Sequence, residues 1–302
     1  MAEPAEKESA KPLYPIRQVS EQTGVNSVTL RAWERRYGLV KPQRTPKGHR
    51  LYSQEDIESI KRIVELLEQG SSLSAIRTTL TSDASGDFTS NVWEGYLDQM
   101  QRAISQFDEG RLDAQYSEAM SLYPVAVVMN QVLLPLLKQL GDRWKRGEGS
   151  VAEEHFFGVY VRNKLGARLH HSSNPPRGPK LISACLPNEY HDFGLLMFAL
   201  IGREHGLRQI ILGTSTPLEE LPDVVSRCNA DGIVLSATAH PEASVLKQLA
   251  TLAESVGVPV FLGGAGSLNI KAELAEVSII LVGSDVLAAV REIRQQLLTA
   301  NG

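Results

Sequence analysis

The chain has 302 residues and a net charge of −4, and 42% of its residues are apolar and 22% charged. This length suits two or three domains, the composition is ordinary for a folded soluble protein, and the charge excludes a uniformly basic nucleic-acid binder. No apolar run is long enough to span a membrane, and Cys185 and Cys228 fall in or beside predicted buried elements, so we expect a cytoplasmic protein without a disulfide framework.

The N-terminal region predicts a small DNA-binding fold after a disordered tail. Residues 1–12 mix charge, alanine and proline, which is typical of disorder. From Tyr14, a short helix and a turn at residues 24–26 precede a second helix, which we expect Ser27 to cap and which runs to Tyr37. Two helices joined in this way predict a helix-turn-helix, whose second helix enters the major groove of DNA.

Basic residues concentrate on the second helix and in the segment that follows it. Only Glu34 opposes them in this stretch. Such a local excess is the electrostatic footprint of a DNA-binding surface, which the net charge of the whole chain conceals. The basic residues are Arg31, Arg35, Arg36, Lys41, Arg44, Lys47 and Arg50.

The same segment resembles the MerR winged-helix family through a long motif, which comprises residues 29–39, Pro42 and residues 48–52. The resemblance implies a winged-helix domain over residues 13–80 that binds double-stranded operator DNA. It implies contacts to bases or nearby phosphates from Thr29, Arg31 and Arg35, and contacts to the DNA backbone from Arg36, Tyr37, Arg44, His49, Arg50 and Tyr52. The alternative is that the charged residues are solvated surface; Trp33 is expected to be core.

The segment after the motif predicts the rest of this domain and a linker. Apolar residues at helical spacing over residues 56–69, and a short helix over residues 73–80, complete the domain. Residues 81–90 read as a flexible linker. MerR proteins usually dimerise through a long helix at this point, and this chain has none. We therefore expect the C-terminal part to form a homo-oligomer, a dimer or a tetramer.

Residues 91–172 predict a four-helix bundle. The four helices are expected at residues 91–107, 111–123, 124–146 and 150–171, with glycine-containing breaks at residues 108–110 and 147–149.

Within the bundle, the pattern Trp144, Glu154, His155 resembles the signature of the CarH/LitR group of MerR regulators. In that group the helical module caps the upper face of adenosylcobalamin. The resemblance implies that Trp144 packs against the adenosyl group, that Glu154 hydrogen-bonds it and that His155 lies nearby. The alternative for Trp144 is an ordinary core or interface residue. Some members place a second cobalt-ligating histidine directly after the tryptophan. This chain has Lys145 there, which leaves His155, His170 or His171 as candidates for that role.

Residues 180–302 predict a parallel α/β domain of the flavodoxin-like, Rossmann-related type. Strand candidates at residues 181–186, 209–212, 233–236, 258–262 and 279–282 alternate with helices, and the last helix is expected at residues 286–298. No phosphate-binding glycine motif of the dinucleotide type is present, so NAD is not expected.

His191 follows the first of these strands, where open α/β sheets bind their ligands. Glu189, His191 and Gly194 resemble the motif of base-off, His-on corrinoid proteins, which implies that His191 is the lower axial ligand of cobalt. An acid two residues away can fix the imidazole tautomer and raise its basicity. The alternative is an exposed or hydrogen-bonded loop histidine.

Small residues also follow the later strands. Ser215, Ser236, Gly263 and Gly264 would leave room for the buried nucleotide tail of cobalamin that the resemblance implies. The segment from Ser236 to Thr238 is a partial match, because the family more often has leucine at its third position.

These features together indicate a multidomain transcriptional regulator, not an enzyme, most like the CarH/LitR adenosylcobalamin photoreceptors. The resemblance implies a repressor in which light cleaves the Co–C bond, changes the oligomer and releases operator DNA. One alternative is a light-independent or partner-controlled regulator whose cobalamin fold binds an antirepressor protein. A further alternative is a corrinoid methyl carrier.

Overall fold

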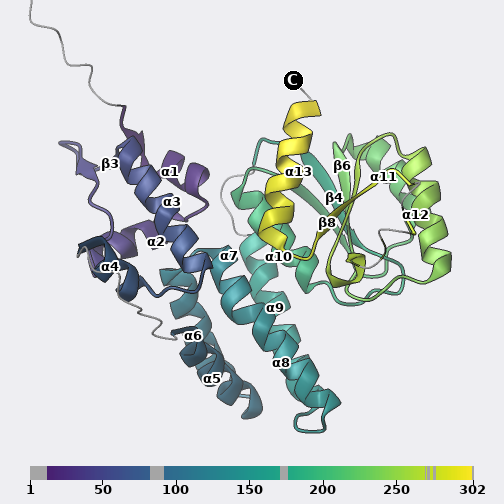
Figure 1. Ribbon diagram of the computed structural model, residues 1–302, viewed down its shortest axis with the longest axis horizontal. Coiled ribbons are helices and arrows are strands. Elements are labelled where there is room, and N and C mark those ends of the chain that lie inside the picture. Colours follow the sequence, from purple (N-terminus) through teal and green to yellow (C-terminus); the bar gives the residue numbers. More distant parts are fainter. Residues whose placement is uncertain are drawn as a thin grey trace, which may run out of the picture. The chain divides into compact units, whose positions relative to one another are not determined.

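The computed structural model describes residues 12–81, 92–170, 176–268, 270, 273–274 and 277–300. The chain divides into two compact units, residues 1–154 and residues 155–302, called here the N-terminal and C-terminal units. Figure 1 colours them along the sequence. Residues 1–11 of the predicted tail, residues 82–90 of the predicted linker and His171 lie outside the described residues. No described helix is long and apolar enough to cross a membrane.

The N-terminal unit begins with the predicted winged helix-turn-helix. A three-stranded antiparallel sheet, in the order β1-β3-β2, accompanies the two helices. The elements are β1 (Tyr14–Pro15), α1 (Ile16–Thr23), α2 (Ser27–Ala32), its π-helical continuation η1 (Trp33–Tyr37), β2 (Gln43–Arg44) and β3 (Arg50–Tyr52).

The cap of α2 differs from the prediction. Asn26, not Ser27, occupies the N-cap position, and its Oδ1 accepts the backbone N–H groups of Val28 at 3.0 Å and Thr29 at 2.9 Å. Ser27 is the first helical residue. Both residue types favour a cap, so the sequence fixes the helix start only to within one residue.

Two further helices complete this module. They are α3 (Gln54–Glu68) and α4 (Leu73–Thr81), close to the predicted positions. A capping box between Ser53 and Asp56 starts α3, and the apolar stripe of α3 is buried as its spacing predicts.

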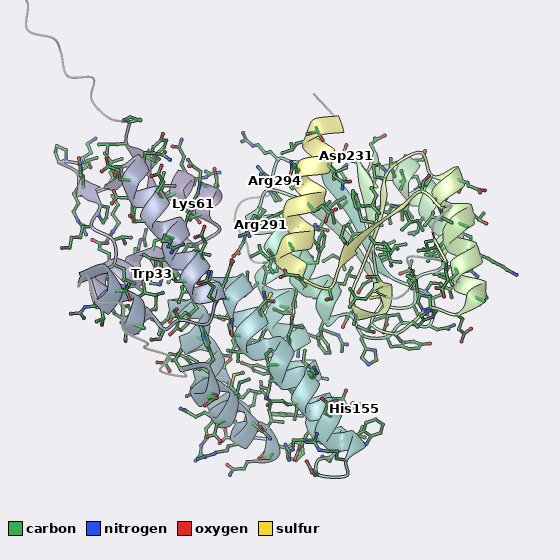
Figure 2. All side chains as sticks on the ribbon, viewed as in Figure 1. Trp33, Lys61, His155, Asp231, Arg291 and Arg294 are labelled. Carbon is green, nitrogen blue, oxygen red and sulfur yellow. The ribbon has the colours of Figure 1, made fainter. Side chains whose placement is uncertain are left out.

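The four predicted bundle helices are present, and the third is interrupted by a π-helical segment. The elements are α5 (Val92–Ser105), α6 (Glu109–Leu122), α7 (Val125–Val128), η2 (Met129–Leu133), α8 (Leu134–Lys145) and α9 (Val151–His170). Helix α6 packs against α2 of the winged module. Trp33, predicted to be core, is fully buried, and its indole Nε1 donates to the carbonyl of Leu122 at 2.8 Å (labelled in Figure 2).

The C-terminal unit contains the predicted parallel sheet. Its strand order is β5-β4-β6-β7-β8, which is the flavodoxin-like order, and its strands are β4 (Lys180–Cys185), β5 (Arg208–Gly213), β6 (Gly232–Ser236), β7 (Val260–Gly263) and β8 (Ile279–Gly283). The helices are α10 (Phe193–Glu204), α11 (Leu221–Cys228), α12 (Ala243–Ser255) and α13 (Val286–Ala300). Helices α10 and α13 pack together, whereas residues of α11 and α12 share a buried apolar cluster with the strands. The strand order reverses between β4 and β6, and this switch point is where such sheets bind ligands.

Candidate functional site

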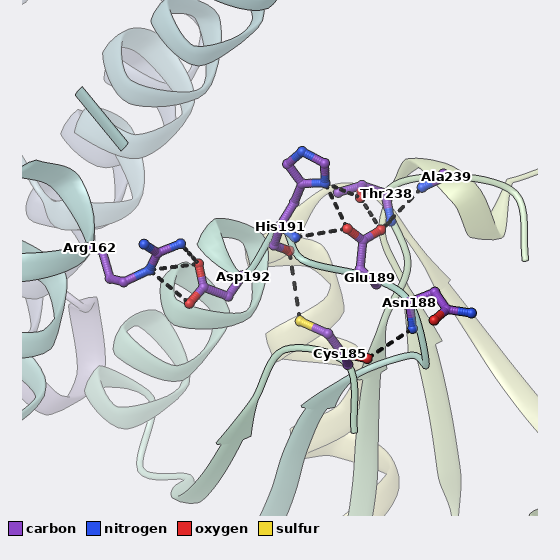
Figure 3. Close-up of polar contacts among 9 residues, drawn as sticks. Arg162, Cys185, Asn188, Glu189, His191, Asp192, Thr238 and Ala239 are labelled. Atoms are coloured by element: carbon purple, nitrogen blue, oxygen red, sulfur yellow. Dashed lines mark hydrogen bonds and ion pairs between the residues drawn. The ribbon is translucent and has the colours of Figure 1, made fainter. Parts of the chain in front are cut away.

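His191 lies on the loop after β4, at the switch point of the sheet. Its Nδ1 is 2.8 Å from Oε1 of Glu189, and the same oxygen accepts the backbone N–H of His191 at 2.9 Å (Figure 3). The side chain is 66% exposed. With Nδ1 held by a carboxylate, Nε2 is the ring nitrogen that points to solvent and is available as a ligand.

Glu189 is itself fixed from the neighbouring loop after β6. Its Oε2 accepts the backbone N–H of Thr238 at 2.8 Å and the Thr238 hydroxyl, and the side chain is only 8% exposed. Burial raises the pKa of Glu189, but the hydrogen bonds from Thr238 and His191 outweigh it and lower the pKa to about 2. An ionised carboxylate on Nδ1 orients the imidazole and makes Nε2 a stronger donor to a metal.

Thr238 is the residue of this arrangement that sequence reasoning missed. It stands where the corrinoid pattern usually has leucine, so it counted as a departure from the motif. The structure shows why threonine is useful there, because its backbone N–H and hydroxyl both bind Glu189. The signal available beforehand was its place directly after β6, beside the switch point.

Replacing Thr238 by valine is expected to destabilise the C-terminal unit by about 1–3 kcal/mol, because a partly buried carboxylate loses a hydroxyl donor. The lowered pKa of Glu189 contributes stability above pH 4.5, its ordinary value, and that contribution is lost as the pH falls towards 2. In Thr238→Val the pKa of Glu189 rises, so acid unfolding followed by circular dichroism should begin at a higher pH. The matched control is Thr251→Val, whose hydroxyl donates to a helix carbonyl at 3.2 Å. Equal acid stability of the two variants would contradict the role of Thr238.

The other predicted small residues lie around the same loops, with separate roles. Ser215 has a positive φ of 45°, its Oγ accepts the N–H of Asn188 at 3.1 Å, and its own N–H donates to the carbonyl of Glu189 at 2.9 Å. Ser236 is buried, and its Oγ lies 3.8 Å from where a Cβ on Gly194 would be. Ser215 therefore fixes the His191 loop, whereas a Cβ on Gly194 would meet Ser236 only at an ordinary contact distance.

Two glycines after β7, Gly264 and Gly266, are required by the protein's own backbone. A Cβ on Gly264 would lie 2.2 Å from the carbonyl oxygen of Ala237, and one on Gly266 would lie 2.0 Å from that of Ala239. At Gly263 the nearest atoms would be 3.2 Å away. The space beside Gly264, which we expected to be left for a cofactor tail, is therefore occupied by the loop after β6. Gly266 was not singled out in the sequence.

Trp144 lies near the end of α8 and is 49% exposed, so it is not an ordinary core residue. The loop after it is held by Arg143, which donates to the carbonyl of Glu148 at 3.1 Å and is 3.4 Å from Oε2 of Glu153. The side chain of Lys145 lies outside the part of the chain that the structure describes.

Glu154 and His155 lie in the first turns of α9, and His155 is exposed (Figure 2). His170, a candidate for the second histidine ligand, lies at the opposite end of the same helix from His155.

The exposed side of the recognition helix carries the predicted cations. Arg31, Arg35 and Arg36 are exposed, as is His49 in the wing, whereas Tyr37 is half-buried. Glu34, the one acid in this stretch, holds the wing: Arg44 Nη2 donates to it at 2.6 Å, and Arg50 Nε donates to its other oxygen. Burial raises the pKa of Glu34, but the hydrogen bonds and charges of Arg50 and Arg44 outweigh burial, so that the pKa lies below its ordinary value.

Two residues that were predicted to contact DNA, Thr29 and Tyr52, are buried inside the protein. Thr29 is fully buried, and its hydroxyl donates to the carbonyl of Ser121 at 3.4 Å, because the inner side of α2 packs on α6. Tyr52 is also fully buried in the winged module, where burial raises its pKa to about 12. Neither side chain lies on the exposed basic surface.

Three known protein families match the chain, in the same order as the winged module, the helical bundle and the parallel α/β domain. Residues 14–83 match the family described as MerR HTH family regulatory protein. Residues 96–169 and residues 179–291 match two families, each described as B12 binding domain. The predicted fold class and the predicted cobalamin cofactor class are thereby confirmed.

Similar proteins extend the match over most of the chain. The HTH-type transcriptional repressor CarH of Myxococcus xanthus is 32% identical over 273 residues, which make up 85% of this chain and 91% of that protein. The repressor CarA of the same organism is 30% identical over 258 residues, or 83% and 86% of the two chains. The solved corrinoid protein for monomethylamine from Methanosarcina barkeri shares the fold, with a TM-score of 0.53 at 14% identity, over 67% of this chain and 99% of its own. The chain thus belongs to the MerR-type, cobalamin-binding transcriptional regulators that include CarH and CarA.

Proposed function

We propose that this regulator is a repressor that senses light through bound adenosylcobalamin. The observation that carries the proposal is the imidazole of His191, held at Nδ1 by an ionised Glu189 and exposed at Nε2 beside the switch point of the sheet. The relatives CarH and CarA support the repressor role, since both are transcriptional repressors.

The residues of the C-terminal unit fit a corrinoid whose lower ligand comes from the protein. His191 would supply Nε2 to cobalt, and Glu189 with Thr238 would hold the ring. Ser215, Ser236, Gly194, Gly263 and Gly264 would shape the loops around the nucleotide tail. Adenosylcobalamin supplies a cobalt–carbon bond that light cleaves.

Residues of the helical region are proposed to contact the adenosyl group. A half-exposed aromatic ring such as that of Trp144 offers an apolar face, and Glu154 offers a hydrogen-bond acceptor. His155 is the nearest imidazole in sequence to that pair, and we propose it as a neighbour of the same group. Loss of the adenosyl group would remove the partner of Trp144.

DNA recognition is assigned to polar and basic residues of α2, of its continuation η1 and of the wing. We propose that Arg31 and Arg35 reach bases or phosphates, and that Arg36, Tyr37, His49, Arg44 and Arg50 hold the DNA backbone. Thr29 and Tyr52 would then act by shaping the module from inside. A homo-oligomer, dimer or tetramer, would engage several such modules at once and raise avidity.

The test is an absorption spectrum of the protein with adenosylcobalamin in darkness, repeated after brief green illumination, with operator binding measured in both states. We expect a bound spectrum that light changes. We also expect operator binding to weaken by about tenfold or more after light, because several modules would no longer bind together. His191→Ala removes the proposed ligand itself and should lower the affinity for the cofactor by at least about 10–100-fold, the range for losing a residue that only supports a ligand. The matched control is His240→Ala, an exposed imidazole on the loop after β6 whose Nδ1 is 2.9 Å from the carbonyl of Pro241.

The outcomes separate the proposal from its rival. Cofactor binding that is independent of His191 would overturn the assigned ligand. Binding that depends on His191, with operator affinity unchanged by light, would overturn light sensing and favour a regulator controlled by a protein partner such as an antirepressor.

A further inference from the structure

Asp192, the residue after His191, behaves unusually for its position. It occupies the N-cap of α10, where aspartate normally accepts the free N–H groups of the helix, yet its side chain makes no cap hydrogen bond. Its carboxylate is bound instead by Arg162 of α9. Arg162 Nε lies 3.2 Å from Oδ1 and 3.1 Å from Oδ2, and Nη2 lies 2.9 Å from Oδ1 (Figure 3).

The next residue, Phe193, packs against the same helix. The guanidinium of Arg162 lies over its ring, 5.4 Å from the centroid. A Cβ on Gly158 would lie 3.2 Å from Cζ of Phe193, so the glycine allows the ring to sit against α9. Gly158 and Arg162 are four residues apart and therefore share one face of the helix.

His191 is thus held from both sides by different parts of the unit. On its N-terminal side, Glu189 is fixed by the loop after β6, as described above. On its C-terminal side, Asp192 and Phe193 are fixed by α9. Asp192 is 13% exposed and Arg162 45%, so the pair is partly shielded from water and geometrically well defined.

We propose that Arg162 is a positioning residue for the cobalt ligand: by clamping Asp192 it fixes the His191 loop, so that Nε2 stays aimed at the corrinoid. This inference rests on the proposed role of His191. Because α9 also carries Glu154 and His155 in its first turns, the Arg162–Asp192 pair connects the helix that bears the proposed adenosyl contacts to the loop that bears the lower ligand.

A nitrogen-isotope experiment on the full chain tests the proposal. The protein is labelled with nitrogen-15, loaded with cobalamin and reduced to the cobalt(II) form, and its electron paramagnetic resonance is recorded. Ligation by a protein imidazole splits the cobalt lines into doublets, ligation by the cofactor's own unlabelled base splits them into triplets, and no nitrogen ligand leaves them unsplit.

We expect doublets for the wild type. Arg162→Ala should move a large share of the signal to triplets or unsplit lines and weaken cobalamin binding by about tenfold, the lower end of the loss seen when a residue that directly orients a metal ligand is removed. Arg162→Lys should be intermediate, since an ammonium keeps the charge but not the bidentate fork. The charge swap Arg162→Asp with Asp192→Arg should restore part of the doublet.

The matched control is Lys164→Ala, which removes a cation from the same helix, where Nζ lies 5.5 Å from the ring centroid of Tyr160. Thermal unfolding of each variant shows that the unit is folded. If the wild type shows the doublet and Arg162→Ala keeps it as strong as Lys164→Ala does, the proposed role of Arg162 is overturned and the role of His191 is not. A wild type without a doublet that depends on His191 would instead overturn the proposed ligand.

Discussion

Replacing Gly264 with alanine is expected to destabilise the C-terminal unit by about 3 kcal/mol or more and to abolish cobalamin binding. The added Cβ would lie 2.2 Å from the carbonyl oxygen of Ala237, and Gly264 has a φ of 101°, which alanine rarely adopts. Backbone strain and overpacking each cost about 1–3 kcal/mol. Since Ala237 immediately precedes Thr238, the loop that fixes Glu189 would have to move.

The position of the tryptophans makes this measurable. All three, Trp33, Trp93 and Trp144, lie in the N-terminal unit, so their fluorescence follows that unit, whereas circular dichroism follows both. In urea, Gly264→Ala should unfold early by circular dichroism with an unchanged fluorescence transition. The control is Gly257→Ala, where φ is 68° and nothing lies within 4 Å, so only about 1–2 kcal/mol of backbone strain is expected. Equal effects would show that the close approach to Ala237 is unimportant.

Replacing Trp33 with alanine is expected to destabilise the N-terminal unit by about 3–5 kcal/mol and to abolish operator binding. The ring is fully buried at the end of α2, and the change also leaves the carbonyl of Leu122 without its indole donor at 2.8 Å. The sheet of the C-terminal unit and the loop that carries His191 should stay folded, because they belong to the other unit.

Fluorescence of the remaining two tryptophans in urea measures the effect of Trp33→Ala, and operator titration measures the loss of function. Trp33→Phe separates the two causes, since it keeps most of the volume but removes the N–H. It should cost about 1–3 kcal/mol, the penalty for an unpaired buried acceptor. Full operator affinity in Trp33→Ala would show that the junction between α2 and α6 does not support DNA binding.

Features that depend on local pattern were predictable from the sequence. Alternating apolar strands and helices predicted the parallel, flavodoxin-like sheet of the C-terminal unit, and His191 lies on the loop after its first strand, as predicted. The turn before α2 was also placed correctly, although Asn26 and Ser27 compete as caps and the pattern does not choose between them.

Features that depend on distant contacts were not predictable. Thr29 looks like a DNA contact until α6, some ninety residues later, is seen to cover it. Thr238 looks like a mismatch until Glu189 is seen beside it. Gly266 carries no local signal, because the atom that excludes a side chain there belongs to Ala239 on another loop.

Helix α2 packs on α6, so the winged module and the helical bundle share one buried junction. If the junction has two arrangements and a ligand binds one of them more tightly, the ligand changes the affinity for operator DNA by some factor. Linkage requires operator DNA to change the affinity for that ligand by the same factor. Protein bound to operator DNA would then have a different ligand affinity from free protein. The number of operator sites would therefore affect the ligand concentration at which the regulator responds.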